Sequence, residues 1–107
     1  MDLDGQLYAE LWVSLASLLR SYTTAHGLNG NRQAMVELGE ERIVVRRGTH
    51  RLELIRTGPK VDWKREDGRT GRLELTEAGT LRGEADEEDM DMAAERWARE
   101  LMQEPKQ

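Results

Sequence analysis

The fold is decided by residues 33–56, QAMVELGEERIVVRRGTHRLELIR, in which apolar and polar side chains alternate along three runs separated by glycine turns. Alternation with a period of two is typical of a β-strand with one buried and one solvent-facing side. If Gly48-Thr49 is a two-residue turn, Val45 lies opposite Leu52 on the apolar side of both strands. The stretch therefore predicts antiparallel strands that share one core face.

The same test extends the sheet in both directions. A two-residue turn at Gly39-Glu40 would place Val36 opposite Ile43, and three further loops are predicted at residues 57–60, 67–69 and 77–79. A slip of one residue would turn each apolar set toward solvent, so the apolar pattern restricts the register. The opposed pairs that these loops predict are Ile43 with Leu54, Trp63 with Leu54, Leu73 with Trp63, Leu75 with Val61, and Leu81 with Leu75.

Two amphipathic segments flank the strands. Apolar residues recur at spacings of three and four from Leu3 to Tyr22, and again from Met90 to Leu101, which is the periodicity of a helix with one buried face. We expect both helices to cover the core face of the sheet. The first apolar stripe is wide, and the surplus formed by Tyr8, Trp12 and Leu19 could pack a homodimer.

The sequence thus predicts an α+β fold, a two-layer sandwich of N-terminal helix, antiparallel β-meander of about five to six strands, and C-terminal helix. Both helices are expected on one sheet face, in a single domain spanning residues 1–107. The expected bounds are 3–26 for the first helix, 33–38, 41–47, 50–56, 61–66, 70–76 and 80–82 for the strands, and 87–103 for the second helix.

Charge is distributed unevenly along the chain. Residues 31–82 carry a net charge of +3 and the remainder −8, for a total of −5. An acidic total argues against duplex DNA as a partner, because neutralising phosphates needs a basic surface. The chain has no cysteine, which is compatible with a reducing compartment, and its apolar segments are too interrupted to span a membrane. We therefore expect a cytoplasmic location and no membrane partner.

The candidate binding residues lie on the polar face of the predicted sheet. Arg46 falls opposite Arg51, and like charges in that position are unfavourable unless an anion offsets them. An anion, such as a phosphate, a single-stranded nucleic acid or a partner carboxylate, would then sit there beside Gln33. The alternative is a solvated ladder of weak pairs, Arg51 with Glu66, Glu53 with Lys64 and Glu37 with Arg42. Apolar residues interrupt that ladder, so the predicted partner-binding set is Met35, Arg42, Val44, Arg46, Arg51, Glu53 and Ile55.

A second candidate is the acidic run before the C-terminal helix. Carboxylates there could bind a hard divalent cation, although acidic residues also suit the first turn of a helix. In its order of elements the chain resembles the frataxin arrangement, with Gly58-Pro59-Lys60, Asp62-Trp63 and acidic flanks as local similarities. The resemblance implies a metal-binding accessory protein. The ligands it would use are Glu84, Asp86, Glu87 and Asp91.

No catalytic constellation is apparent. His26 and His50 are the only histidines, and the sequence places no acidic or hydroxyl partner at catalytic spacing from either. We therefore expect a non-enzymatic interaction or accessory domain with no cofactor, which binds a protein partner or itself through the open sheet face.

Overall fold

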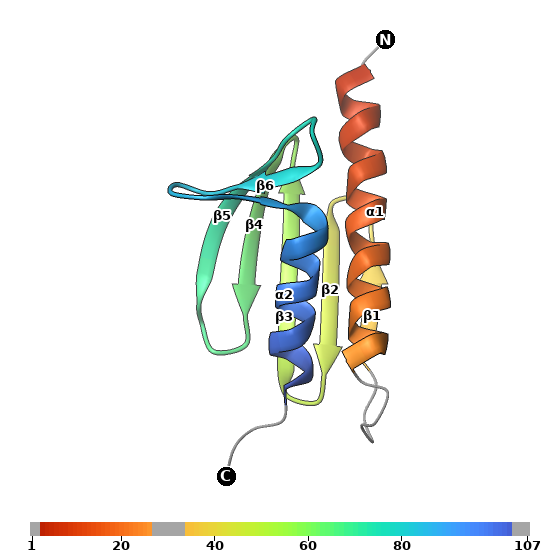
Figure 1. Ribbon diagram of the computed structural model, residues 1–107, viewed down its shortest axis with the longest axis vertical. Coiled ribbons are helices and arrows are strands. Elements are labelled where there is room, and N and C mark those ends of the chain that lie inside the picture. The colour runs from red at the N-terminus through yellow and green to blue at the C-terminus, as the bar shows by residue number, and fades with distance from the viewer. Residues whose placement is uncertain (1–2, 27–33, 104–107) are drawn as a thin grey trace.

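A computed structural model describes residues 3–26 and 34–103 and shows a sheet flanked by two helices (Figure 1). Helix α1 spans Leu3–His26 and helix α2 spans Met90–Met102. Between them lies one antiparallel sheet whose strand order is the chain order. The strands are β1 (Met35–Leu38), β2 (Arg42–Arg47), β3 (His50–Thr57), β4 (Lys60–Arg65), β5 (Thr70–Leu75), β6 (Thr80–Arg82) and β7 (Glu87–Asp89).

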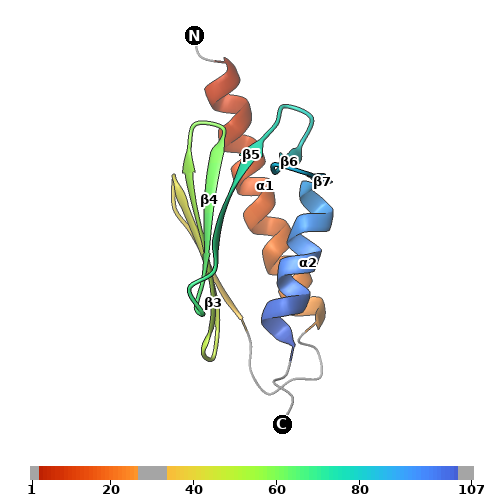
Figure 2. The same ribbon diagram turned by 90° about the vertical axis from the view of Figure 1, so that its left-hand side faces the viewer.

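The predicted two-layer architecture is confirmed. Both helices pack side by side on one face of the sheet and leave the other face open (Figures 1 and 2). The expected start of the first strand at Gln33 lies outside the described residues. Within residues 3–26 and 34–103, neither helix combines the length and apolar character that a membrane span requires.

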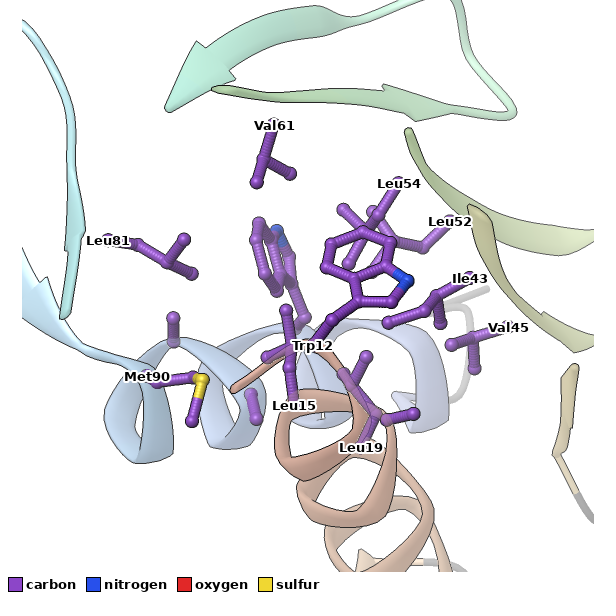
Figure 3. Close-up of a cluster of buried hydrophobic side chains, with 14 of the residues drawn as sticks. Trp12, Leu15, Leu19, Ile43, Val45, Leu52, Leu54, Val61, Leu81 and Met90 are labelled. Atoms are coloured by element: carbon purple, nitrogen blue, oxygen red, sulfur yellow. The ribbon is translucent and has the colours of Figure 1, made fainter. Parts of the chain in front are cut away.

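The core lies between the two layers. Helix α1 contributes Trp12, Leu15 and Leu19, which meet the sheet and the apolar stripe of α2 (Figure 3). Trp12 and Leu19 are buried there, and Tyr8 packs against the same cluster. The expectation of a surplus helix surface for a dimer is therefore wrong for Trp12 and Leu19, which the core covers, whereas Tyr8 is only partly buried.

Three of the predicted hairpin registers are confirmed. Val45 pairs with Leu52, Leu54 with Trp63, and Leu75 with Leu81. The β2–β3 turn uses Gly48 with φ of 59°, a conformation that glycine adopts without steric cost.

The β1–β2 register differs from the prediction by two residues. Val36 pairs with Val45, and Leu38 pairs with Ile43, so the strands are joined by residues 39–41 and the Gly39 N–H donates to the carbonyl of Arg42, 2.7 Å away. A two-residue hairpin turn needs positive φ at one or both of its central residues, and Gly39 has no positive φ. A slip of two residues leaves every side chain on its predicted face.

The β4–β5 register also differs by two residues. Trp63 lies opposite Gly71 rather than Leu73, and Val61 lies opposite Leu73 rather than Leu75. A Cβ at position 71 would approach the indole of Trp63 to within 2.7 Å at Cζ2, so the ring occupies the space that a side chain would fill. The absence of a side chain at Gly71 permits this pairing.

The acidic run forms a short strand, which the sequence did not predict. Glu87–Asp89 pairs with β6, so α2 begins at Met90 and not at residue 87. The backbone N–H of Met90 donates to the carbonyl of Gly79, 3.0 Å away, in the β5–β6 turn. This bond fixes the start of α2 against the sheet.

Candidate partner-binding surface

The seven residues predicted to bind a partner lie together on the open face of the sheet. They belong to β1, β2 and β3, and the register places Met35, Arg46 and Arg51 in one row across these strands. Arg42 pairs with Ile55 and Val44 pairs with Glu53 in the neighbouring rows. We call this set, Met35, Arg42, Val44, Arg46, Arg51, Glu53 and Ile55, the open-face patch.

The patch offers two apolar side chains to solvent. Met35 is 65% exposed and Ile55 is 40% exposed. Val44 is buried between its sheet neighbours Glu37 and Glu53, with Arg42 and Arg46 on either side along its own strand. Val44 therefore lies beneath the exposed side chains of the patch, and a partner would contact Met35 and Ile55 instead.

The charges of the patch are only partly paired. Glu53 forms ion pairs with Arg42 and, at 3.6 Å, with Arg51. Arg46 lies directly opposite Arg51, as predicted, and no carboxylate among residues 3–26 and 34–103 pairs with it. The patch thus keeps one exposed guanidinium without a counter-charge from the described chain.

The predicted ladder of ion pairs does not form. Glu53 pairs with Arg42 rather than Lys64, and the register shift moves Glu37 away from Arg42. Glu66 accepts a hydrogen bond from the backbone N–H of Arg51, 2.9 Å away, and not from its guanidinium. Period-two alternation assigns side chains to a face, but it does not say which neighbour each long side chain selects.

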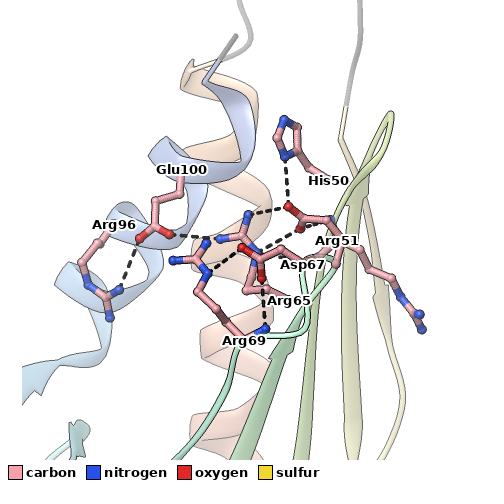
Figure 4. A network of polar contacts seen from close by, with 8 residues as sticks. His50, Arg51, Arg65, Asp67, Arg69, Arg96 and Glu100 are labelled. Carbon is pink, nitrogen blue, oxygen red and sulfur yellow. Dashed lines mark hydrogen bonds and ion pairs between the residues drawn. The ribbon is translucent and has the colours of Figure 1, made fainter. Parts of the chain in front are cut away.

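Arg65, the last residue of β4, is buried on the face of the sheet that the helices cover, and the sequence did not predict its contacts. Arg65 donates through Nη1 to Glu100 of α2 at 3.0 Å, and through Nε to Glu66 at 3.1 Å (Figure 4). Its position in the alternation after Val61 and Trp63 was the available signal, because a charged residue on the core face needs partners. The network joins the C-terminal part of α2 to the sheet.

This network perturbs one carboxyl group. Burial alone would raise the pKa of Glu66, but the Arg51 backbone N–H and the Arg65 guanidinium lower that pKa to about 2. Glu66 therefore stays ionised over the whole neutral range.

Both histidines have acidic neighbours that the sequence did not reveal. His50 Nδ1 lies 3.4 Å from Glu66, and His26 Nε2 lies 3.4 Å from Glu95. In each case the carboxylate also binds an arginine, Arg65 or Arg99. Glu66 therefore belongs to the network that reaches α2 through Arg65, and Glu95 belongs to an ion pair between successive turns of α2.

The acidic residues near β7 are dispersed. Glu87 accepts a hydrogen bond from the Thr80 hydroxyl at 2.6 Å, and Asp91 accepts one from the Tyr22 hydroxyl at 2.6 Å. The bond to Asp91 raises the pKa of Tyr22. In the part of the chain that the structure describes, no three acidic or histidine side chains converge on a point that could hold a metal ion. The arrangement of Glu84, Asp86, Glu87 and Asp91 does not favour the metal-binding alternative.

Comparisons with known proteins add no functional information to this geometry. No protein-family model matches the chain, and no curated protein and no solved structure matches it significantly.

Proposed function

We propose that the protein is a non-enzymatic interaction module whose open-face patch binds a segment of a protein partner. The observation that carries the proposal is the row Met35, Arg46 and Arg51, in which an exposed methionine lies beside two opposed guanidinium groups. The segment we expect carries apolar side chains flanked by carboxylates, so that it can cover Met35 and Ile55 and neutralise Arg46.

The chemistry of the patch supports this choice. Arginine, methionine and aromatic residues are enriched at protein interfaces, whereas charge ladders of paired lysine and glutamate are typical of solvated surfaces. Adjacent strands hold the patch rigid, so binding loses little conformational entropy on the side of this protein. Because Glu53 is shared by Arg42 and Arg51, it leaves Arg46 available to a partner carboxylate.

Selection from a library of random peptides displayed on phage would test the proposal. Selected peptides are titrated into isotopically labelled protein, and the amide signals that shift identify the surface that they contact. We expect shifts on β1 to β3 at open-face positions and a consensus of apolar residues next to aspartate or glutamate. The double variant Met35→Glu/Ile55→Glu should bind at least ~30-fold more weakly, as expected for loss of about 2 kcal/mol.

Met92→Glu is the control for the charge that each of these two substitutions adds. Met92 lies on α2 and is 56% exposed, so the variant places a charge on comparable apolar surface away from the patch. Unchanged affinity in the double variant, or shifts confined to the helices, would overturn the proposal. Sedimentation of the free protein separates a partner from a second copy, because concentration-dependent dimers lost in the double variant would identify the occupant as another molecule of this chain.

The opposed guanidinium groups of Arg46 and Arg51 also favour a second candidate function, binding of a single-stranded nucleic acid. Its affinity for oligothymidylate should fall steeply as salt rises, and Arg46→Gln should weaken it. Inorganic phosphate should compete for the same arginines. Salt-insensitive binding, or none, excludes this candidate.

A further inference from the structure

A groove separates α1 from the β1–β2 hairpin on the helix side of the sheet. It has a volume of about 590 Å³, and its lining includes Trp12 and Val13 from α1, Leu38 to Glu41 from the hairpin, and Arg56 from β3. The groove shares no residue with the open-face patch. Its position therefore allows a binding event separate from the proposed function.

Apolar side chains form two walls of this groove. Val13 is 51% exposed and Leu38 is 42% exposed, and each lines the groove from a different element. Trp12 lies in the same lining and is almost fully buried, with its indole N–H donating to the carbonyl of Gly39 at 3.3 Å. This bond fixes the ring between helix and hairpin. A rigid apolar site open to solvent is suited to an inserted apolar side chain.

The positively charged side chain in the groove, Arg56, contacts other groups of the protein. The guanidinium carbon of Arg56 lies 5.9 Å from the centroid of the Trp12 ring, and Nη1 donates to the carbonyl of Gly58 at 3.2 Å. Arg56 Nε is buried and has no hydrogen-bond partner within the described residues. Arg56 therefore supports the Trp12 ring, and its single positive charge is outnumbered in the groove lining by the carboxylates of Glu40 and Glu41.

The acidic groups in the groove have no such partners. Glu40 and Glu41 are exposed, and neither forms an ion pair within residues 3–26 and 34–103. Two free carboxylates beside an apolar site attract lysine or arginine and repel an anionic segment. The charge of the groove is thus opposite to that of the open-face patch, and the two surfaces should select different ligands.

We propose that this groove is a second docking site, which binds a basic amphipathic segment of a protein partner. An apolar side chain of the segment packs between Val13 and Leu38 on Trp12. Basic side chains on either side of it pair with Glu40 and Glu41.

Three synthetic peptides test the proposal by amide chemical-shift titration of the labelled protein. The first alternates leucine with arginine, the second replaces each arginine with glutamate, and the third replaces each leucine with alanine. We expect the first to shift the amides of residues 9–13 and 38–41, and the other two to bind at least ~10-fold more weakly, since each loses one of the two interactions. Absence of shifts with the first peptide, or shifts on the open face, would overturn the proposal.

A charge-reversal variant makes the test specific to this groove. The variant Glu40→Lys/Glu41→Lys should no longer bind the peptide that contains arginine and should bind the peptide that contains glutamate. Glu84→Lys/Asp86→Lys makes the same change of net charge in the loop after β6 and should keep the original preference. If both variants lose the arginine peptide equally, attraction to the overall negative charge explains the binding and the groove does not.

Discussion

Gly71 shows how one residue can decide a register. The β4–β5 pairing places it opposite Trp63, whose ring covers the glycine and fills the space of a side chain. Alternation permits Leu73 opposite Trp63 equally well, because both candidate partners lie on the core face. The volume of the tryptophan ring favours the partner without a side chain, and sequence periodicity carries no information about that volume.

Gly71→Ala should therefore destabilise the protein. Alanine normally suits a strand at least as well as glycine does, but here its Cβ would collide with Trp63, and overpacking of this kind costs about 1–3 kcal/mol. Urea denaturation measures the change in free energy of unfolding. Gly39→Ala is the control, since a Cβ there would lie 3.5 Å from its nearest neighbour, an ordinary contact. Equal stability of the two variants would show that Trp63 does not hold this register.

At the scale of elements, the Arg65 network ties β3, β4 and α2 together. Glu66 accepts from the Arg51 backbone on β3 and from Arg65 on β4, and Arg65 also reaches Glu100 on α2. Helix α2 is distant in sequence from the β3–β4 hairpin, so no local pattern predicts the contact between Arg65 and Glu100. A charged residue at a core-facing strand position was the only sign of it.

The network predicts a specific loss of stability in acid. The pKa of Glu66 falls from 4.5 to about 2 on folding, so its stabilisation is complete above pH 4.5 and disappears as the pH drops toward 2. Glu66→Gln should lower the free energy of unfolding by about 1–2 kcal/mol at pH 5, in the range for hydrogen bonds to charged groups. Near pH 2, where Glu66 in the folded protein is about half protonated, only a small part of this difference should remain.

Urea denaturation between pH 5 and pH 2 measures this difference. The pKa of Glu95 is also lowered, but Glu66 does not act on it, so its contribution cancels in the comparison. The charge of Glu66 raises the pKa of Asp67, so the variant should lower that pKa further. A constant difference across the range would mean that Glu66 acts through packing and not through its charge.

The elements themselves could be predicted to different degrees. The span of α1 follows from helical periodicity, and the β2–β3 register follows from the Gly48-Thr49 turn. The β1–β2 register was predicted two residues away from the observed one because Val36 and Leu38 are both apolar and satisfy either register. Strand β7 has no apolar alternation, since it is an acidic edge strand whose pairing with β6 is set by the tertiary structure.

At the scale of the whole molecule, the open-face patch and the groove have opposite chemistry on different sides of the sheet. The patch combines apolar side chains with arginine, and the groove combines them with glutamate. The residues of the patch could be predicted because the alternation of apolar and polar residues along a strand tells which side chains share a face of the sheet. The groove could not, because Val13 and Leu38 are 25 residues apart and meet only through the packing of α1 on the hairpin.

Ligands at the two surfaces should bind independently. With the groove saturated by the arginine and leucine peptide, the affinity of a peptide selected on the open face should change by less than ~2-fold, because sites without shared residues are usually additive. Fluorescence anisotropy of the labelled open-face peptide measures this. A change of ~10-fold or more would instead reveal coupling between the sites of about 1.4 kcal/mol.

The side-by-side packing of α1 and α2 has a consequence for how the chain folds. Every strand pairs with its neighbour in sequence, so the sheet can assemble from short loops, whereas the Tyr22–Asp91 contact between the helices spans 69 residues. Closing a loop of that length costs about 4 kcal/mol in entropy, more than the about 1 kcal/mol that one hydrogen bond returns. The apolar contacts of the helices must supply the difference, and the sheet can form hairpin by hairpin before the two helices join.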